Sequence, residues 1–102
     1  MKARLLLAAA VVACTPIAAA AQAYLYAGRD LAAACAICHG TDGANASGIP
    51  SVAGQPKEYL VLQLRNFRDG KRAATVMQQT SKGLTEEQID AVATFWSAQK
   101  AK

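Results

Sequence analysis

Two cysteines and one histidine lie within five consecutive residues, and this stretch constrains the chain more than any other feature. Cys35 and Cys38 are separated by two residues, and His39 follows the second cysteine directly. The four steps from Cys35 to His39 make about one helical turn, so a helix here brings both sulfurs and the imidazole close together. His39 is also the only histidine among the 102 residues. We therefore expect these three side chains to share one binding partner.

The motif has three chemical interpretations. A thioredoxin-like redox pair would need a βαβ context and a larger domain, and this sequence shows neither. A zinc site needs four ligands, and Cys35, Cys38 and His39 provide only three. The third interpretation is haem c, whose porphyrin forms thioethers with two cysteines while the next histidine binds its iron. The spacing favours haem c, with Cys35 and Cys38 as attachment residues and His39 as an iron ligand.

Met77 is the candidate for the second axial ligand of that iron. It is the only methionine besides Met1, and it lies in residues 71–84, which must cover the face of the haem opposite His39. A lone methionine is otherwise a flexible core residue. A thioether favours ferrous iron, so a His39 and Met77 pair raises the reduction potential relative to two imidazoles. Because this pair also excludes oxygen and peroxide, we expect one-electron transfer rather than enzymatic catalysis.

The first 23 residues have the pattern of an export signal. Two basic residues precede an apolar run, and small residues offer cleavage sites after Ala21 or, preferably, after Ala23. The run is too short and too interrupted for a transmembrane helix. Lipoprotein processing at Cys14 is an alternative, because residues 11–14 resemble a bacterial lipobox. We expect a signal peptide over residues 1–23, one domain over residues 24–102, and a periplasmic location.

The net charge and the chain length limit the possible partners and the size of the core. The net charge is +4, and residues 24–102 carry nine basic against seven acidic residues with the signs mixed. This pattern does not indicate a nucleic-acid partner. A domain of about 79 residues is near the size at which apolar burial barely outweighs chain entropy. A bound group must then help to fill the core.

The rest of the sequence predicts an all-α fold with three main helices and long loops. Residues 26–39 repeat small or apolar side chains at helical spacing, and residues 56–69 place a broad apolar face before Gly70. A capping box from Thr85 to Gln88 opens a third helix that contains Phe95. Residues 41–55 are rich in glycine and have little periodicity, which predicts a loop that a ligand must order.

These residues together resemble a small class I cytochrome c. The similarity extends from the helix with Gly28, through the cysteine motif and Pro50, to Met77 and the helix with Phe95. Residues 74–77 and 81–87 most resemble the bacterial branch that contains the cytochrome subunit of flavocytochrome c sulfide dehydrogenase. The resemblance implies the cytochrome c fold, wrapped around one covalent haem.

The resemblance also implies roles for individual residues. Cys35 and Cys38 would be the thioether sites, with His39 and Met77 as the axial ligands. Pro50 would accept a hydrogen bond from the free ring nitrogen of His39, and Gly28 and Phe95 would lie where the first and last helices cross. The sulfide dehydrogenase subunit is often a tandem of two haem domains, whereas this sequence has one haem motif. A monohaem form is therefore expected.

Four functions remain open from the sequence. The chain is either a free periplasmic electron carrier or the electron-accepting subunit of a flavoprotein sulfide dehydrogenase. A haem sensor or peroxidase would need a labile sixth ligand, and a thiol oxidoreductase would need free cysteines. Arg65, Arg68 and Arg72 form a basic edge that either steers an acidic redox partner or is a solvated face, and we favour the solvated face. The apolar surface at Ala36 and Ile37 is the preferred docking region for a redox protein.

Overall fold

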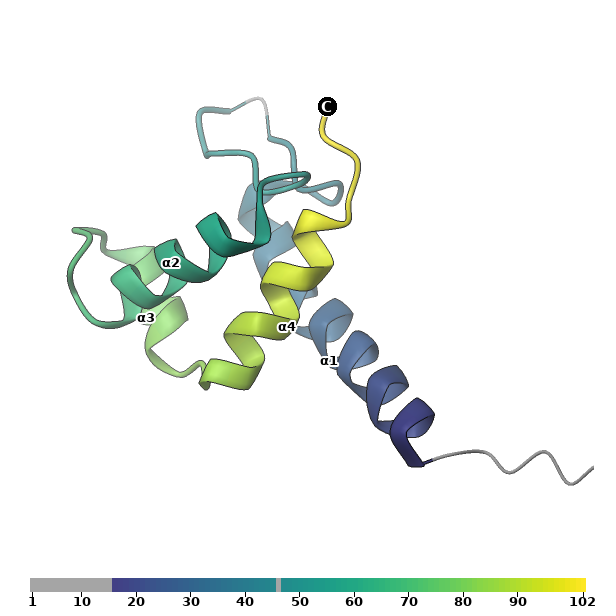
Figure 1. Cartoon of the computed structure of the whole chain (residues 1–102). Helices are drawn as coiled ribbons and strands as arrows, with labels where there is room; N and C mark the ends of the chain where they lie inside the picture. Colours follow the sequence, from purple (N-terminus) through teal and green to yellow (C-terminus); the bar gives the residue numbers. More distant parts are fainter. Residues whose placement is uncertain (1–15, 46) are drawn as a thin grey trace, which may run out of the picture.

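The computed structural model describes residues 16–45 and 47–102, which form four α-helices joined by loops (Figure 1). The helices are α1 (Pro16–His39), α2 (Lys57–Arg68), α3 (Val76–Lys82) and α4 (Glu86–Ser97). No strand occurs in the described ranges, so the all-α prediction is confirmed. The basic start of the predicted signal and the Cys14 lipobox lie outside these residues. None of the helices in the described part of the chain is long and apolar enough to cross a bilayer.

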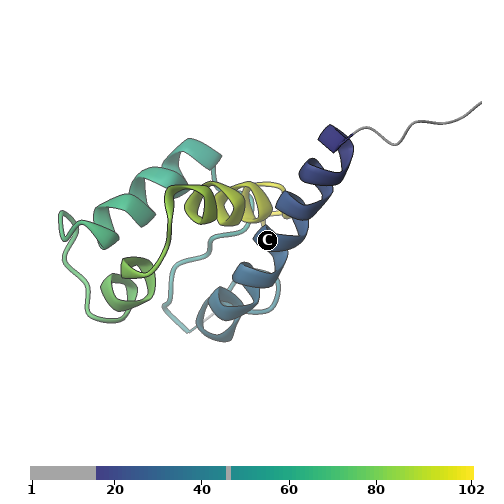
Figure 2. The ribbon, with the colours of Figure 1, turned by 90° about the horizontal axis from the view of Figure 1, so that it is seen from below.

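Helix α4 is the centre of the packing. It contacts α1 on one side and α2 on the other, and α2 also contacts α3 (Figures 1 and 2). At the crossing of α1 and α4, a Cβ added to Gly28 would lie 2.5 Å from the carbonyl oxygen of Ala91. The glycine therefore admits the backbone of α4 at Ala91, one turn before Phe95. The predicted crossing is present, although the closest approach to Gly28 is by backbone rather than by an aromatic ring.

Two helices differ from the sequence prediction. Helix α1 begins at Pro16 rather than at residue 26, so it includes the last part of the predicted signal. Helix α3 differs from the prediction of three main helices joined by long loops, which places no helix within residues 71–84. It has only seven residues, and the side chain of Thr75 makes no capping hydrogen bond at its start. Such a short helix depends on packing, here against α2, which local sequence does not reveal.

The other two helices follow the prediction closely. Pro56 is the N-cap residue of α2, one position before its first helical residue. At the start of α4 the capping box is complete: Gln88 donates its backbone N–H to the Thr85 hydroxyl, and the Gln88 side chain accepts from the Thr85 N–H. These are contacts between residues three apart, which is why sequence alone could predict them.

The core is small and consists mainly of small side chains. Among the residues that the structure describes, four of the eight buried apolar side chains are alanines, and the larger ones are one isoleucine, one leucine, one tryptophan and one valine. The eight are Ala32, Ala53, Leu60, Ile89, Ala91, Val92, Ala93 and Trp96. Burial of apolar side chains is the main favourable contribution to folding. This set is too small to be the whole core of a stable domain of this length.

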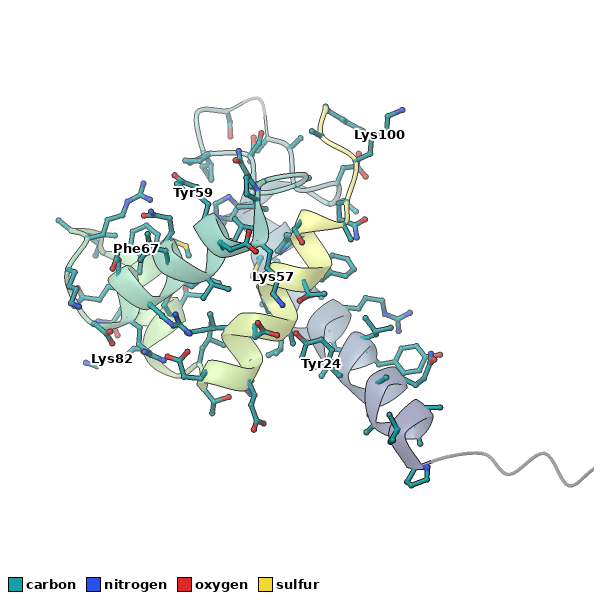
Figure 3. The ribbon with its side chains drawn as sticks, in the orientation of Figure 1. Tyr24, Lys57, Tyr59, Phe67, Lys82 and Lys100 are labelled. Atoms are coloured by element: carbon teal, nitrogen blue, oxygen red, sulfur yellow. The ribbon has the colours of Figure 1, made fainter. Side chains whose placement is uncertain are left out.

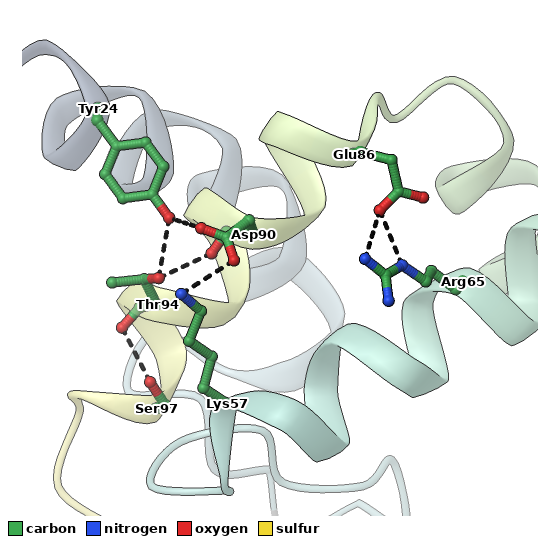
Figure 4. Close-up of polar contacts among 7 residues, drawn as sticks. All are labelled: Tyr24, Lys57, Arg65, Glu86, Asp90, Thr94 and Ser97. Carbon is green, nitrogen blue, oxygen red and sulfur yellow. Dashed lines mark hydrogen bonds and ion pairs between the residues drawn. The ribbon is translucent and has the colours of Figure 1, made fainter. Parts of the chain in front are cut away.

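Polar contacts join the three longer helices (Figure 4). The Tyr24 hydroxyl of α1 hydrogen-bonds to Asp90 and Thr94 of α4, with 3.0 Å to the Thr94 hydroxyl. Asp90 also forms a 2.9 Å ion pair with Lys57 of α2. One acidic side chain of α4 is therefore the common partner of groups from α1 and α2.

Asp90 gives a prediction about acid stability. The Tyr24 hydroxyl, and after it Lys57, hold the pKa of the Asp90 carboxyl below its usual value. A carboxyl whose pKa is lower in the folded state than in the unfolded state stabilises the fold at pH values above the unfolded-state pKa. This stabilisation is lost as the pH falls through the folded-state pKa. We expect Asp90→Asn to lower the free energy of unfolding at pH 7 by about 1 kcal/mol or less, because the half-exposed side chain is screened by solvent.

Denaturant titrations from pH 7 to pH 2 measure this effect. The difference between wild type and Asp90→Asn should shrink below about pH 4, near the ordinary aspartate pKa. Glu87→Gln, on the same helix, is the matched control because Glu87 forms no ion pair with the described residues. A difference that stays constant over the whole pH range would contradict this explanation.

Candidate functional site

One pocket is lined by residues from all four helices. Its chemically active side chains are Cys35 and His39 from α1 and Met77 from α3. Its remaining walls are apolar or aromatic, and comprise Val52, Leu60, Leu64, Val92, Ala93 and Trp96. Three of the five predicted site residues therefore face the same space, although Met77 lies 38 residues beyond His39 in sequence.

His39 is held in one orientation at the end of α1. The helix ends because Gly40 adopts a φ of 91°, in the left-handed region that favours glycine. The Nδ1 atom of His39 lies 2.6 Å from the carbonyl oxygen of Pro50. Because a carbonyl can only accept, Nδ1 carries the proton of this bond and the lone pair of neutral His39 is on Nε2. The ring is thus prepared to bind a metal through Nε2, as an outer hydrogen bond does for many histidine ligands.

The two cysteines have different surroundings. Cys35 is half-buried and lines the pocket, whereas Cys38 is exposed, and no disulfide joins them. Burial raises the pKa of the Cys35 thiol, and the side chain of Trp96 partly opposes this shift. The structure therefore brings Cys35 together with His39 and Met77, while Cys38 lies at the surface and Pro50 lies behind the His39 ring.

Met77 is half-buried in the first turn of α3 and lines the pocket. A short helix that packs on α2 thus positions Met77, where the sequence predicted a long loop. A helix restricts the directions available to the side chain more than a loop does, because χ1 is limited by the preceding turn.

The predicted basic edge is largely paired within the molecule. Arg65 and Arg68 both form ion pairs of 2.7 Å with Glu86 of α4. Arg72 donates a 2.7 Å hydrogen bond to Gln63, and its guanidinium lies 4.6 Å from the centre of the Phe67 ring. Phe67 lies in α2 and is labelled in Figure 3. These contacts agree with the solvated-face interpretation of the three arginines.

Comparison with known proteins decides the family. The family described as cytochrome c oxidase, cbb3-type, subunit III matches residues 19–95. Cytochrome c-554(548) of Halomonas halodenitrificans is 37% identical over 78 residues, covering 72% of this chain and 94% of that protein. The chain belongs to the cytochrome c family. The predicted cytochrome c fold is confirmed by this finding and by the solved structure below.

Two further comparisons place this cytochrome c among bacterial relatives. The cytochrome subunit of sulfide dehydrogenase from Chlorobaculum tepidum is 44% identical over 69 residues, covering 68% of this chain and 63% of that protein. The solved structure of cytochrome c4 from Acidithiobacillus ferrooxidans aligns with a TM-score of 0.62 and 42% identity, covering 64% of this chain and 38% of that one. This cytochrome c thus spans less than two thirds of the length of either protein.

The cofactor of this family is covalent haem c with its iron, and the pocket residues fit it. The donor set of one imidazole and one thioether is a known haem iron ligation, and the other walls are apolar. The shortage of large buried side chains in the described residues also leaves a core that a bulky apolar group would complete. The donor set and the shortage of large buried side chains are both features of this chain itself, independent of its family.

One pocket residue was missed as a site residue from the sequence. Trp96 is 3% exposed, and its Nε1 is buried without a hydrogen-bond partner among residues 16–45 and 47–102. From the sequence, Trp96 is only the residue after Phe95 in the last predicted helix. The sequence did contain a signal for this role. Trp96 is the sole tryptophan, and the indole N–H of a buried tryptophan usually finds a hydrogen-bond acceptor.

Proposed function

We propose that this cytochrome c transfers single electrons in the periplasm through one covalent haem. The observation that carries the proposal is the shared pocket, in which Cys35, His39 and Met77 converge from two helices among apolar walls. Haem c supplies a metal centre that gains and loses one electron. The residues of this chain hold it, select its potential and exclude water.

Each site residue has a distinct part in this proposal. Cys35 and Cys38 hold the haem through thioethers, and the exposed position of Cys38 leaves its sulfur accessible. His39 binds the iron through Nε2, while the Pro50 carbonyl fixes its ring by accepting the Nδ1 proton. Met77 binds from α3, and its sulfur raises the reduction potential. With His39 and Met77 both holding the iron, the site would favour electron transfer over the binding of an external ligand.

The covalent link gives a direct prediction. We expect one haem per chain, because the sequence has one attachment motif. Thioethers survive denaturation, so acid acetone should leave the colour with the protein, and a pyridine haemochrome assay should give a ratio of one. Colour that enters the solvent would contradict attachment at Cys35 and Cys38.

We further propose that residues 24–102 are the mature protein. Support comes from Tyr24, which would be its first residue and whose side chain is held on α4 by Asp90 and Thr94. Mass spectrometry of the N-terminus after periplasmic extraction tests this proposal. Cleavage after Ala23 is expected, and a diacylated Cys14 would show the lipoprotein alternative instead.

A second candidate function is that of a haem-bearing electron-accepting subunit in a flavocytochrome c sulfide dehydrogenase. The 44% identity to the cytochrome subunit from Chlorobaculum tepidum favours it. Affinity purification of the chain from its native periplasm distinguishes the two functions. A flavin-containing chain that copurifies at one to one would support the subunit, and a lone monomer would support the free carrier. A haem sensor or peroxidase is less favoured, because Met77 faces the pocket.

A further inference from the structure

The indole of Trp96 is a buried hydrogen-bond donor without an acceptor in the described part of the protein. Its Nε1 atom is inaccessible to solvent, and the whole side chain is 3% exposed. A buried donor that is left unpaired destabilises the folded state, so native proteins usually supply a partner. The partner is therefore to be sought in the pocket that Trp96 lines with Cys35, His39 and Met77.

The ring of Trp96 is fixed by its neighbours and cannot turn its N–H toward solvent. Gly43, with a φ of 71°, packs so closely that an added Cβ would lie 2.6 Å from ring atom Cζ3. Phe95 meets the ring edge to face, with centroids 5.0 Å apart. The backbone is held as well, because the Trp96 carbonyl accepts a 2.9 Å hydrogen bond from the Gly54 N–H.

The candidate acceptor is the sulfur of Cys35, which lines the same pocket as Trp96 and packs against the core cluster that contains Trp96. The side chain of Trp96 is close enough to lower the pKa of the Cys35 thiol, against the larger effect of burial. The thiol itself has only a weak contact, with Sγ 3.9 Å from the Leu31 carbonyl oxygen. Donor and sulfur thus line one pocket, and no hydrogen bond joins them.

We propose that Trp96 is a positioning residue whose indole N–H donates a hydrogen bond to the Cys35 sulfur in the haem-bound protein. This inference rests on the proposed attachment at Cys35. A donor at the thioether withdraws electron density from the sulfur and, through it, from the macrocycle. Outer hydrogen bonds of this kind are one means by which a protein tunes a haem potential. The reduction potential should therefore be higher with the indole than without it.

Two changes at position 96 test the proposal in opposite directions. Trp96→Phe removes the donor and is expected to lower the midpoint potential of the haem-bound protein. A fluorinated tryptophan has a more acidic N–H and is expected to raise it; because the chain has one tryptophan, this label enters at position 96 alone. Phe95→Leu is the matched control, since it disturbs the same aromatic pair without removing a donor. It should lower thermal stability and leave the potential unchanged.

Nuclear magnetic resonance provides a readout that packing does not mimic. In the ferrous protein labelled with 15N, the single indole proton should resonate downfield of an unbonded indole N–H once the ring-current shift of the haem is subtracted, as a hydrogen-bonded proton does. Equal potentials in wild type, Trp96→Phe and the fluorinated protein would overturn the proposal and leave Trp96 as a packing residue. A Trp96→Phe variant whose potential acquires a different pH dependence would also overturn it, because the N–H would then serve a haem carboxylate.

The outcome is separable from that of the proposed function. If the wild type lacks covalent haem, the attachment at Cys35 fails and the inference fails with it. If the wild type carries one covalent haem and only the changes at Trp96 are without effect, the proposed function stands and this inference alone is wrong.

Discussion

Replacement of Met77 by alanine is expected to lower the reduction potential by on the order of 100 mV or more, since axial ligands shift haem potentials over a range of about 0.8 V. The physical reason is that ferrous iron loses the thioether that stabilises it. The ferric protein should also lose the weak near-infrared band of sulfur ligation, and its iron should bind cyanide. Potentiometric titration and absorption spectra measure all three changes.

Two further variants separate the ligand from its surroundings. Met77→His should keep the iron six-coordinate but still lower the potential, which distinguishes a change of ligand type from loss of a ligand. Val76→Ala is the matched control, because Val76 precedes Met77 in α3 and is 65% exposed. An unchanged spectrum and potential in Met77→Ala would mean that another group binds the iron or that the sixth position is open. An open position would favour a haem catalyst or sensor.

The double change Cys35→Ala with Cys38→Ala is expected to leave the chain largely unfolded. Without attachment, the described part of the domain has eight buried apolar residues to stabilise it, half of them alanines. A small domain is stabilised by about 5–15 kcal/mol in total, so loss of the central group removes most of this margin. Far-ultraviolet circular dichroism against temperature should show low helicity and no cooperative transition.

Ile37→Ala is the control for this prediction. Ile37 lies between the two cysteines but is 84% exposed, so its replacement should change stability little. Two causes could unfold the double variant: lost attachment and lost thiol packing. Cys38→Ala alone separates them, because Cys38 is exposed and its replacement removes an attachment sulfur without removing core packing. A cooperative transition in the double variant at the temperature of the haem-bound protein would show that the polypeptide core is sufficient.

Local sequence predicted those parts of the molecule that depend on neighbouring residues. The capping box of α4, the start of α2 after Pro56 and the helix that ends at His39 all arise from contacts within about one turn. The cysteine motif is likewise local, because haem attachment needs two sulfurs and an imidazole at fixed spacing. These features carry the resemblance to the cytochrome c family, which the comparisons with known proteins confirm.

Contacts between residues that are far apart in the sequence were determined only by the tertiary structure. Helix α3 has seven residues and no side-chain cap, so its existence depends on packing against α2. The close approach of α4 to Gly28 and the enclosure of the Trp96 indole beside Cys35 both join residues about 60 positions apart. Hydrophobic periodicity states which face of a helix is buried but not what it is buried against. The sequence therefore predicted which chemical groups the pocket contains, and long-range packing determined how those groups are arranged.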